Sequence, residues 1–334
     1  MTPLEIRPVS GAGAEVLGVD ISNLSVGDWN QIEAAFGAFG AIIFRDQILN
    51  EQDHLNFARR WGTIRPSTDG AHTGHPTVDS GGAPTAGAPI RGAWRSELSY
   101  DQTPAMGSVV VARSVPTTGV FTLLCSTSDA FDALTSSTQR ELEGLTAIHS
   151  KHAVPANAPR GDESQEAADR VHHPLVIRHP ISGRKTLFVN PSYTVGIAGV
   201  DEIEGLALLN QLYEHCQREE FVGRIDWEVG TVALWDDRSM WNFSGIRDLD
   251  QCVFHRVGIE GVTLTPAAQT VTREPSLTQR AGATLAGGVI TAAMMGIAEV
   301  IDPERVRPDI EIVSEAPEQE PLTPLDFGGL PPLD

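Results

Sequence analysis

The stretch Gly107-Ser-Val-Val-Val-Ala-Arg113 has the length of one strand and an apolar centre, and Phe121-Thr-Leu-Leu124 follows it closely. Short runs rich in β-branched residues are typical of buried strands. Three similar runs lie on either side, at residues 41–44, 231–235 and 253–259. The chain is therefore predicted to be mainly β, with an antiparallel core of short strands.

Other segments complete this picture. Residues 4–8 and 16–19 read as short strands, and residues 174–178 and 185–189 flank the turn residues Ile181-Ser-Gly-Arg184, which predicts a hairpin. Apolar residues at helical spacing predict flanking helices that start near Asp28, after the N-cap Asn50, and over residues 126–145 and 201–217. In the last of these, Ile203, Leu206, Leu209 and Tyr213 are predicted to face the core.

The domain organisation follows from changes in composition. Residues 1–265 are predicted to form one domain, in which the Gly-, Pro- and Thr-rich residues 67–92 and the polar residues 153–169 are lid-like loops. Residues 266–301 read as a partly helical Ala/Gly/Thr-rich extension. Residues 302–334 hold nine acidic residues, two arginines and seven prolines, which predicts an extended acidic tail.

The overall charge argues against several classes of partner. The 334 residues include 24 Lys and Arg against 44 Asp and Glu, a formal net charge of −20. Such a chain repels phosphate backbones and anionic membrane surfaces, so neither nucleic acid nor a membrane is an expected partner. The three widely spaced cysteines suggest neither a disulfide framework nor a zinc cluster. With no signal-peptide pattern at the N-terminus, a cytoplasmic location is predicted.

Separated motifs occur in a fixed order along residues 1–262. They are Gly40-Ala-Ile-Ile-Phe-Arg45, Trp94-Arg-Ser-Glu-Leu-Ser-Tyr100, Gly107-Ser-Val-Val-Val-Ala-Arg113, Leu142-Glu-Gly-Leu-Thr-Ala-Ile-His149, His179-Pro-Ile-Ser-Gly-Arg-Lys-Thr-Leu-Phe-Val-Asn190, Trp235-Asp-Asp-Arg238 and His255-Arg256. Their joint order and spacing resemble the taurine dioxygenase (TauD/TfdA) family of iron(II)/2-oxoglutarate-dependent oxygenases. The resemblance implies a double-stranded β-helix core, a cupin-like jelly roll, with helices packed outside.

The resemblance also implies a metal site that has been altered. The family binds iron through a His-X-Asp pair and a distant second histidine, and those positions align with Arg95, Glu97 and Asn242 here. A guanidinium has no lone pair to offer a cation, and a neutral amide oxygen is a weak ligand. Only Glu97 keeps a carboxylate that suits iron(II). The expectation is that all three ligand positions are replaced and that iron(II) is not held there.

An alternative is that the alignment is locally shifted and that other histidines bind the metal. The candidates are His72, His75, His149, His172, His173, His179 and His255. No histidine in the sequence is followed two residues later by Asp or Glu, so an intact His-X-Asp/Glu pair is missing. This favours replacement of the triad over a shift.

The resemblance implies partial preservation of the 2-oxoglutarate site. Gly119-Val-Phe-Thr122 stands where the family has a Gly-Gly-Asp-Thr turn, and Arg256 matches the arginine that pairs with the distal carboxylate. A second arginine expected four residues earlier is Cys252. Thr122 and Arg256 are thus candidates to bind 2-oxoglutarate or another dicarboxylate, with a purely structural role as the alternative. Trp94, Trp241 and Phe243 are interpreted as packing residues, with stacking on a substrate as the alternative.

Two residues at the altered positions are predicted to interact directly. Arg95 and Glu97 are expected to form an ion pair in the former metal cavity, with the amide oxygen of Asn242 accepting a hydrogen bond from the guanidinium. The expected function is that of a non-oxygenase, a pseudoenzyme that binds a small anionic metabolite or partners an active paralogue. The alternatives are a dioxygenase with a rebuilt metal site and a metal-independent enzyme that uses Arg95 and Glu97 as catalytic groups. The family resemblance also makes a homo-oligomer an expectation.

Overall fold

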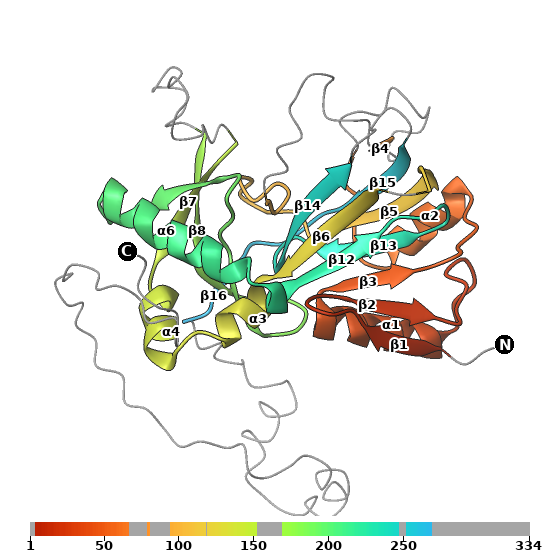
Figure 1. The fold of residues 1–334 in the computed structure, drawn as a ribbon, viewed down its shortest axis with the longest axis horizontal. Coiled ribbons are helices and arrows are strands. Elements are labelled where there is room, and N and C mark those ends of the chain that lie inside the picture. Colours follow the sequence, from red (N-terminus) through yellow and green to blue (C-terminus); the bar gives the residue numbers. More distant parts are fainter. Residues whose placement is uncertain are drawn as a thin grey trace, which may run out of the picture. The chain divides into compact units, whose positions relative to one another are not determined.

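The computed structural model describes residues 4–66, 79–80, 94–117, 119–151, 169–246 and 252–268 (Figure 1). These residues belong to one compact unit that includes Met1–Gln269. Most of the two predicted lid-like loops, nearly all of the predicted extension and the whole acidic tail lie outside the described residues. Their assignments stay predictions.

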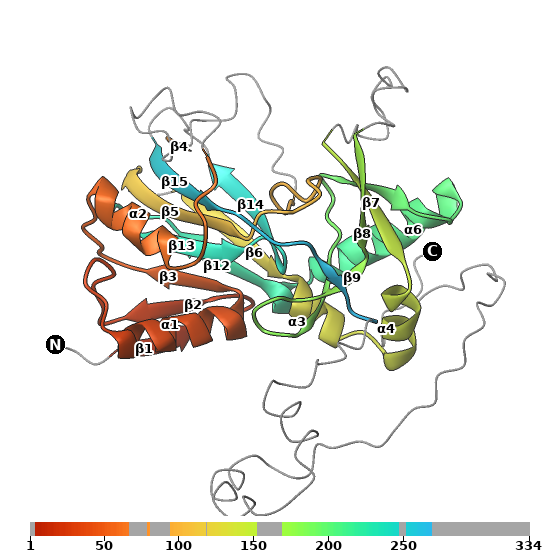
Figure 2. The same ribbon diagram turned by 180° about the vertical axis from the view of Figure 1, so that it is seen from behind.

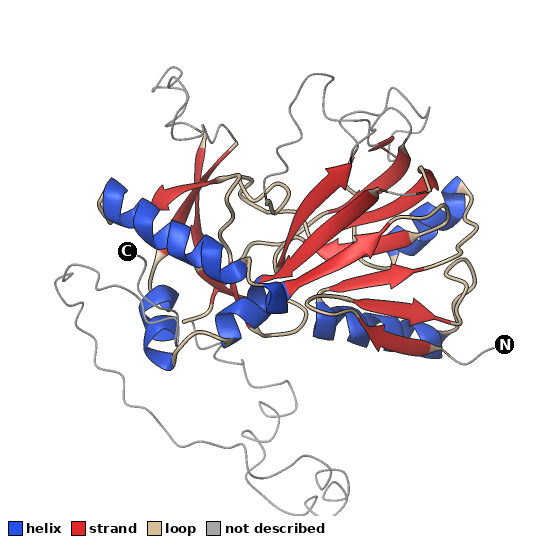
Figure 3. Cartoon of the chain, viewed as in Figure 1, coloured by secondary structure: helices blue, strands red, loops and turns tan. Residues whose placement is uncertain are grey.

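The largest element is a seven-stranded sheet. Its order is β1 (Glu5–Pro8), β2 (Ala14–Leu17), β3 (Ala41–Phe44), β13 (Val232–Asp236), β5 (Gly107–Ser114), β15 (Val253–Ile259) and β4 (Asp79–Ser80). The pairings are antiparallel except for β2 and β3, which run parallel. A second sheet, of β12 (Val222–Asp226), β6 (Val120–Ser126) and β14 (Met240–Ile246), is antiparallel throughout. The two sheets form the predicted jelly-roll core (Figures 1 and 3).

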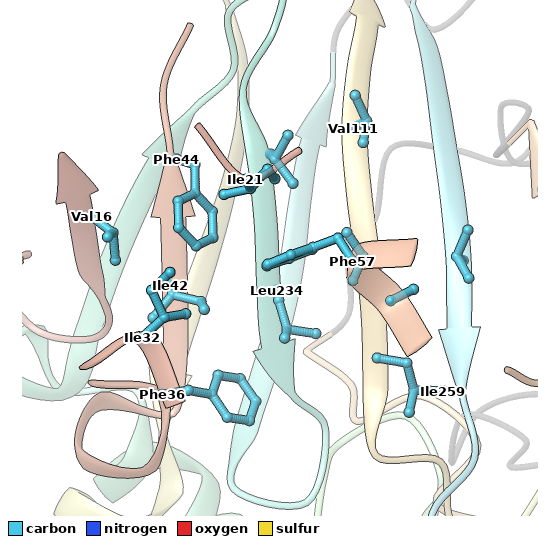
Figure 4. Packing of buried hydrophobic residues seen from close by; sticks show 14 of the residues in the cluster. Val16, Ile21, Ile32, Phe36, Ile42, Phe44, Phe57, Val111, Leu234 and Ile259 are labelled. Carbon is cyan, nitrogen blue, oxygen red and sulfur yellow. The ribbon is translucent and has the colours of Figure 1, made fainter. Parts of the chain in front are cut away.

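The alternation of side chains along β3 explains how the layers are held together. Ala41 and Ile43 are buried with Leu124 and Ile225 of the second sheet. Ile42 and Phe44 project to the other face, because successive residues of a strand point to opposite sides. There they join a cluster with helices α1 (Val26–Phe39) and α2 (Glu51–Arg59), which Figure 4 shows in part.

Helix α2 begins where the sequence predicts, after Asn50, and α1 begins at Val26, slightly before the predicted Asp28. Ser25 caps α1 and Asn50 caps α2, and each forms a capping box with an aspartate three residues later, Asp28 and Asp53. Seen from behind, α1 and α2 lie against the large sheet (Figure 2). The helices thus cover the face that does not meet the second sheet.

The remaining elements surround a further hydrophobic cluster, which also includes Cys125 of β6 and Trp241 of β14. They are β7 (Thr146–Ser150), β8 (Arg170–Pro174), β9 (Val176–Arg178), β10 (Lys185–Leu187), β11 (Thr194–Ile197), β16 (Thr265–Pro266), α3 (Thr127–Asp132), α4 (Ser136–Glu143), α6 (Glu202–Cys216) and η1 (Glu219–Phe221). The predicted hairpin is confirmed, since β9 and β10 pair antiparallel. In the described part of the chain, no helix has the length and apolar character needed to span a bilayer.

Two helix predictions were wrong in part. The single helix expected over residues 126–145 is two short helices, α3 and α4, since the chain leaves the helical conformation after Asp132 and Thr135 caps a new helix. The predicted core face of α6 was also misplaced. Ile203 is 79% exposed, whereas Leu208, Leu209 and Leu212 are buried. This helix has apolar residues on more than one side, so the sequence pattern alone does not determine which face is buried.

Candidate functional site

Arg95 and Asn242, far apart in sequence, lie side by side. The Arg95 N–H donates to the Asn242 carbonyl oxygen at 3.1 Å, and the Asn242 N–H donates to the Arg95 carbonyl oxygen at 2.8 Å. This is an isolated antiparallel bridge at the edge of β14. The bridge is limited to Arg95, and the chain turns over the next residues with Leu98 at a φ of 56°. A left-handed leucine is uncommon and marks a strained turn.

The predicted ion pair is present. Arg95 Nε donates to Glu97 Oε1 at 2.6 Å, and the two side chains are 34% and 18% exposed. Burial alone would raise the pKa of Glu97, but the positive charges of Arg256 and Arg95 outweigh it, so the net shift is downward. The pKa of Arg95 is raised, because the charge of Glu97 outweighs the opposing effect of burial. Both groups are thus held in their charged forms.

The predicted role of Asn242 was wrong in its direction. Its amide nitrogen donates to the Arg95 carbonyl oxygen at 3.1 Å and to Asp237 Oδ1 at 3.4 Å. Among the described residues, no hydrogen bond joins the Asn242 amide oxygen to the Arg95 guanidinium. The reason is that the antiparallel bridge places the Asn242 side chain over the backbone of Arg95 rather than over its guanidinium.

The two residues expected to bind 2-oxoglutarate each have a protein partner. Thr122 is buried on β6, and its hydroxyl accepts a hydrogen bond from Trp227 Nε1 at 2.9 Å. Arg256 on β15 donates from Nε to Ser108 Oγ at 2.8 Å. In the described part of the chain no hydrogen bond joins Thr122 to Arg256. Arg256 contributes its charge to the site instead, since it is the strongest electrostatic partner of Glu97.

Asp237 belongs to this site and was missed by sequence reasoning. It is 2% exposed, and its Oδ1 also accepts a hydrogen bond from Trp235 Nε1 at 3.2 Å. Its other oxygen, Oδ2, is buried with no hydrogen-bond partner among the described residues. Burial and the nearby charge of Glu97 raise the pKa of Asp237 well above its usual value. The only signal in the sequence was the Asp-Asp pair before Arg238.

Asp237→Asn should therefore raise the free energy of unfolding at neutral pH by roughly 1–2 kcal/mol, because it removes a poorly satisfied buried acid. Between the unfolded and the raised folded pKa, the folded state keeps a proton that the unfolded state releases, so Asp237 makes stability fall as pH rises. The variant should lose that slope. Urea unfolding at about pH 4 and about pH 7 measures it, with the exposed Asp226→Asn as control. A less stable Asp237→Asn protein with an unchanged slope would contradict the prediction.

Two tyrosines add to the group of polar residues that includes Arg95, Glu97 and Asp237. The rings of Tyr193 and Tyr100 meet edge to face with centroids 4.8 Å apart. Burial, followed by the charge of Glu97, raises the pKa of Tyr193 to about 12, so its phenol stays protonated. Tyr100 also lines a cleft of about 550 Å³, together with Asp101, Gln102, Lys151, Asp169, Arg170 and Val171.

The aromatic residues beside Arg95 and Asn242 make the contacts of packing residues. Trp241 is fully buried and donates from Nε1 to the Val189 carbonyl oxygen at 2.6 Å. Trp94 contacts both Trp241 and Phe243, with ring centroids 6.4 and 5.6 Å apart. Trp94 and Trp241 thus help to hold the turn that carries Arg95.

Four of the described histidines proposed as alternative metal ligands have other partners, and the fifth, His172, is exposed on β8. His149 hydrogen-bonds to Ser99 and to the Phe188 carbonyl oxygen, His173 to the Asp101 carbonyl oxygen, His179 to Asp236 and Ser182, and His255 to Arg113. Burial lowers the pKa of His149 to about 3, so it is neutral. Within the described ranges, no three His, Cys, Asp or Glu side chains are grouped as a metal site. His72 and His75 lie outside those ranges.

Comparison with known proteins places this fold and motif order in a family. The 2,4-dichlorophenoxyacetate dioxygenase of Cupriavidus pinatubonensis (strain JMP 134 / LMG 1197), named as alpha-ketoglutarate-dependent, is 31% identical over 275 residues, covering 75% of this chain and 90% of that protein. The (S)-phenoxypropionate/alpha-ketoglutarate-dioxygenase of Sphingobium herbicidovorans is 27% identical over 268 residues, covering 75% of this chain and 93% of that protein.

A solved structure agrees. The crystal structure of a taurine dioxygenase from Burkholderia xenovorans superimposes with a TM-score of 0.66 at 28% identity, covering 78% of this chain and 90% of that one. The family model described as "Taurine catabolism dioxygenase TauD, TfdA family" matches residues 5–241. The chain therefore belongs to the TauD/TfdA family.

Proposed function

We propose that this chain is a TauD/TfdA-family protein whose metal-binding triad has been replaced by Arg95, Glu97 and Asn242. It is a non-oxygenase that binds a small anionic metabolite or partners an active paralogue. The observation that carries the proposal is the 2.6 Å contact between Arg95 Nε and Glu97 Oε1. The guanidinium takes the place opposite the carboxylate where a cation would bind.

The chemistry of these three side chains does not fit iron(II). Arginine has five N–H donors and no acceptor, and it stays charged in proteins. The Glu97 oxygen that faces Arg95 is already used, and Asn242, whose amide nitrogen donates to Arg95 and Asp237, could offer a metal only its neutral oxygen. Bringing a divalent cation beside Arg95 and Arg256 would add charge repulsion to a set of poor donors.

The purified protein should hold well below one iron(II) per chain, and anaerobic titration with iron(II) followed by elemental analysis measures this. The matched variant is Arg95→His/Asn242→His, which supplies the two imidazoles that the family places there. It should bind iron(II) more tightly than the unmodified chain, because imidazole with a carboxylate suits this metal.

Binding of close to one iron(II) per chain by the unmodified protein, with micromolar affinity or better, would contradict the proposal. That result would support a dioxygenase with a rebuilt metal site, as the names of the relatives suggest. Turnover of a substrate in the presence of chelator would instead support a metal-independent enzyme with Arg95 and Glu97 as its charged groups. Size measurement in solution tests the expected homo-oligomer, and co-purification with an intact family member tests the paralogue.

A further inference from the structure

Two of the three cysteines meet in the folded chain, although they are far apart in sequence. All three are present as thiols. Cys125 on β6 and Cys216, the last residue of α6, are both fully buried, and the Cys125 thiol donates from Sγ to the Cys216 carbonyl oxygen at 2.9 Å. Cys252 packs against a different hydrophobic cluster. The wide spacing of the cysteines along the chain hides this contact in the sequence.

The path of the chain explains why these two residues meet. Helix α6 ends at Cys216, η1 turns the chain, and β12 begins at Val222, which pairs directly with Cys125. The end of α6 is thereby held near the second sheet (Figure 1). The last carbonyl groups of a helix have no partner within the helix, and the Cys125 thiol supplies one for Cys216.

The same contact brings the two side chains together. The carbonyl carbon and the Cβ of Cys216 are bonded to one Cα, so a thiol that touches the carbonyl oxygen lies near the start of the Cys216 side chain. A disulfide requires Cα atoms within roughly 7 Å of each other. Both residues also belong to one buried cluster with Phe131, Leu212 and Phe221, which keeps them in this arrangement.

We propose that Cys125 and Cys216 form an oxidation site, at which a small disulfide such as oxidised glutathione converts the two thiols into a disulfide that joins β6 to the end of α6. One cysteine attacks the small disulfide and releases one small thiol, and the other cysteine then attacks the mixed disulfide and releases the second. The proton of each attacking thiol passes to the thiolate that leaves. The proposal goes beyond the proposed function, because it does not depend on the residues at the metal-binding positions.

Cys216 is placed to react first. The next residue, Gln217, is exposed, and so are Glu219 and Glu220 of η1. Opening of the last turn of α6 therefore gives a small disulfide access to the Cys216 thiol, since helix ends open more easily than helix centres. Burial raises the pKa of the Cys125 thiol well above its usual value. Cys125 thus stays protonated in the closed state and reacts second.

The test is equilibration of the full chain with a series of glutathione redox buffers, once folded and once in concentrated urea. Acid quenching, alkylation of the remaining thiols and peptide mapping by mass spectrometry then give the fraction of each linkage. The equilibrium constant for the link between Cys125 and Cys216 should be about thirtyfold or more larger in the folded chain. The reason is that a disulfide which fits the fold stabilises it by the same factor by which the fold favours the disulfide.

Two variants serve as controls. Cys252→Ser keeps both proposed partners and should leave this equilibrium constant unchanged. Cys216→Ala removes one partner, so its melting temperature should not depend on the glutathione ratio. In the unmodified chain, oxidation should raise the melting temperature by roughly 5–15 °C, because the link closes a long loop in the unfolded state. Dithiothreitol should reverse the rise.

An equilibrium constant that is no larger in the folded chain than in urea would overturn the proposal. A folded chain in which either residue is linked mainly to Cys252 would do the same. Circular dichroism of each variant confirms that the folded samples are folded. None of these results concerns iron, so the metal titration tests the proposed function separately.

Discussion

Replacing Arg238 by methionine should lower the free energy of unfolding by about 3–5 kcal/mol, the usual cost of leaving one partner of a buried ion pair alone. Arg238 donates to both oxygens of Asp236, at 2.8 and 2.6 Å, and the two side chains are 4% and 0% exposed. Asp236 also hydrogen-bonds to His179 Nε2 at 3.0 Å. Methionine fills a similar space without charge. The buried carboxylate of Asp236 would therefore lose most of the positive charge that balances its own.

The measurement is urea unfolding of Arg238→Met beside the matched Arg224→Met. Arg224 is paired with Asp226 at the surface, with side chains 48% and 63% exposed, so its loss should cost at most about 1 kcal/mol. Similar losses for the two variants would mean that the buried network does not stabilise the fold.

The difference in unfolding free energy between Arg238→Met and the unmodified chain should depend on pH. Although burial opposes it, the charge of Arg238 and then that of His179 hold the pKa of Asp236 far below its usual value. A carboxyl with a depressed folded pKa adds stability above its unfolded pKa and loses it as pH falls through the folded value. In Arg238→Met the carboxyl should protonate at higher pH. The gap between variant and unmodified chain should therefore be largest near neutral pH and shrink in acid.

The Arg95–Glu97 pair should show a favourable coupling of about 1–2 kcal/mol in a double-mutant cycle. Arg95→Ala alone should cost about 1–3 kcal/mol, less than for a fully buried pair because the arginine is 34% exposed. It leaves the Glu97 charge near the buried Asp237, whereas Glu97→Ala leaves Arg95 near Arg256 without its counter-charge. The double variant should therefore be more stable than the sum of the single losses predicts.

The chain offers a matched control for this cycle. Arg7 and Glu5 are also two residues apart and form a 3.1 Å ion pair, but their side chains are 58% and 59% exposed. Their coupling should be below about 0.5 kcal/mol, because solvent screens an exposed pair. Equal coupling energies in the two double-mutant cycles, or no coupling between Arg95 and Glu97, would contradict the proposal that this ion pair has replaced a metal.

Local patterns were sufficient for much of the fold. The buried strand at residues 41–44, the cap Asn50, and the hairpin between β9 and β10 depend on neighbours within a few residues, and each is visible along the chain. Where a local pattern is compatible with two buried faces, tertiary packing determines which face is buried. The core face of α6 depends on which of its apolar sides the rest of the protein covers, and Ile203 is exposed although its spacing allowed burial.

The sequence by itself predicted the ion pair between Arg95 and Glu97, which lie two residues apart, and the structure contains that pair. Only the tertiary structure decided what surrounds them. The Asn242 amide nitrogen donates to the backbone of Arg95, and the Thr122 hydroxyl accepts a hydrogen bond from Trp227. The positive charge of Arg256 lowers the pKa of Glu97. The physical reason is that hydrogen bonds and charges act through space. Strands β5, β6, β14 and β15 meet only in the folded chain, so one strand's sequence cannot say which partner another will supply.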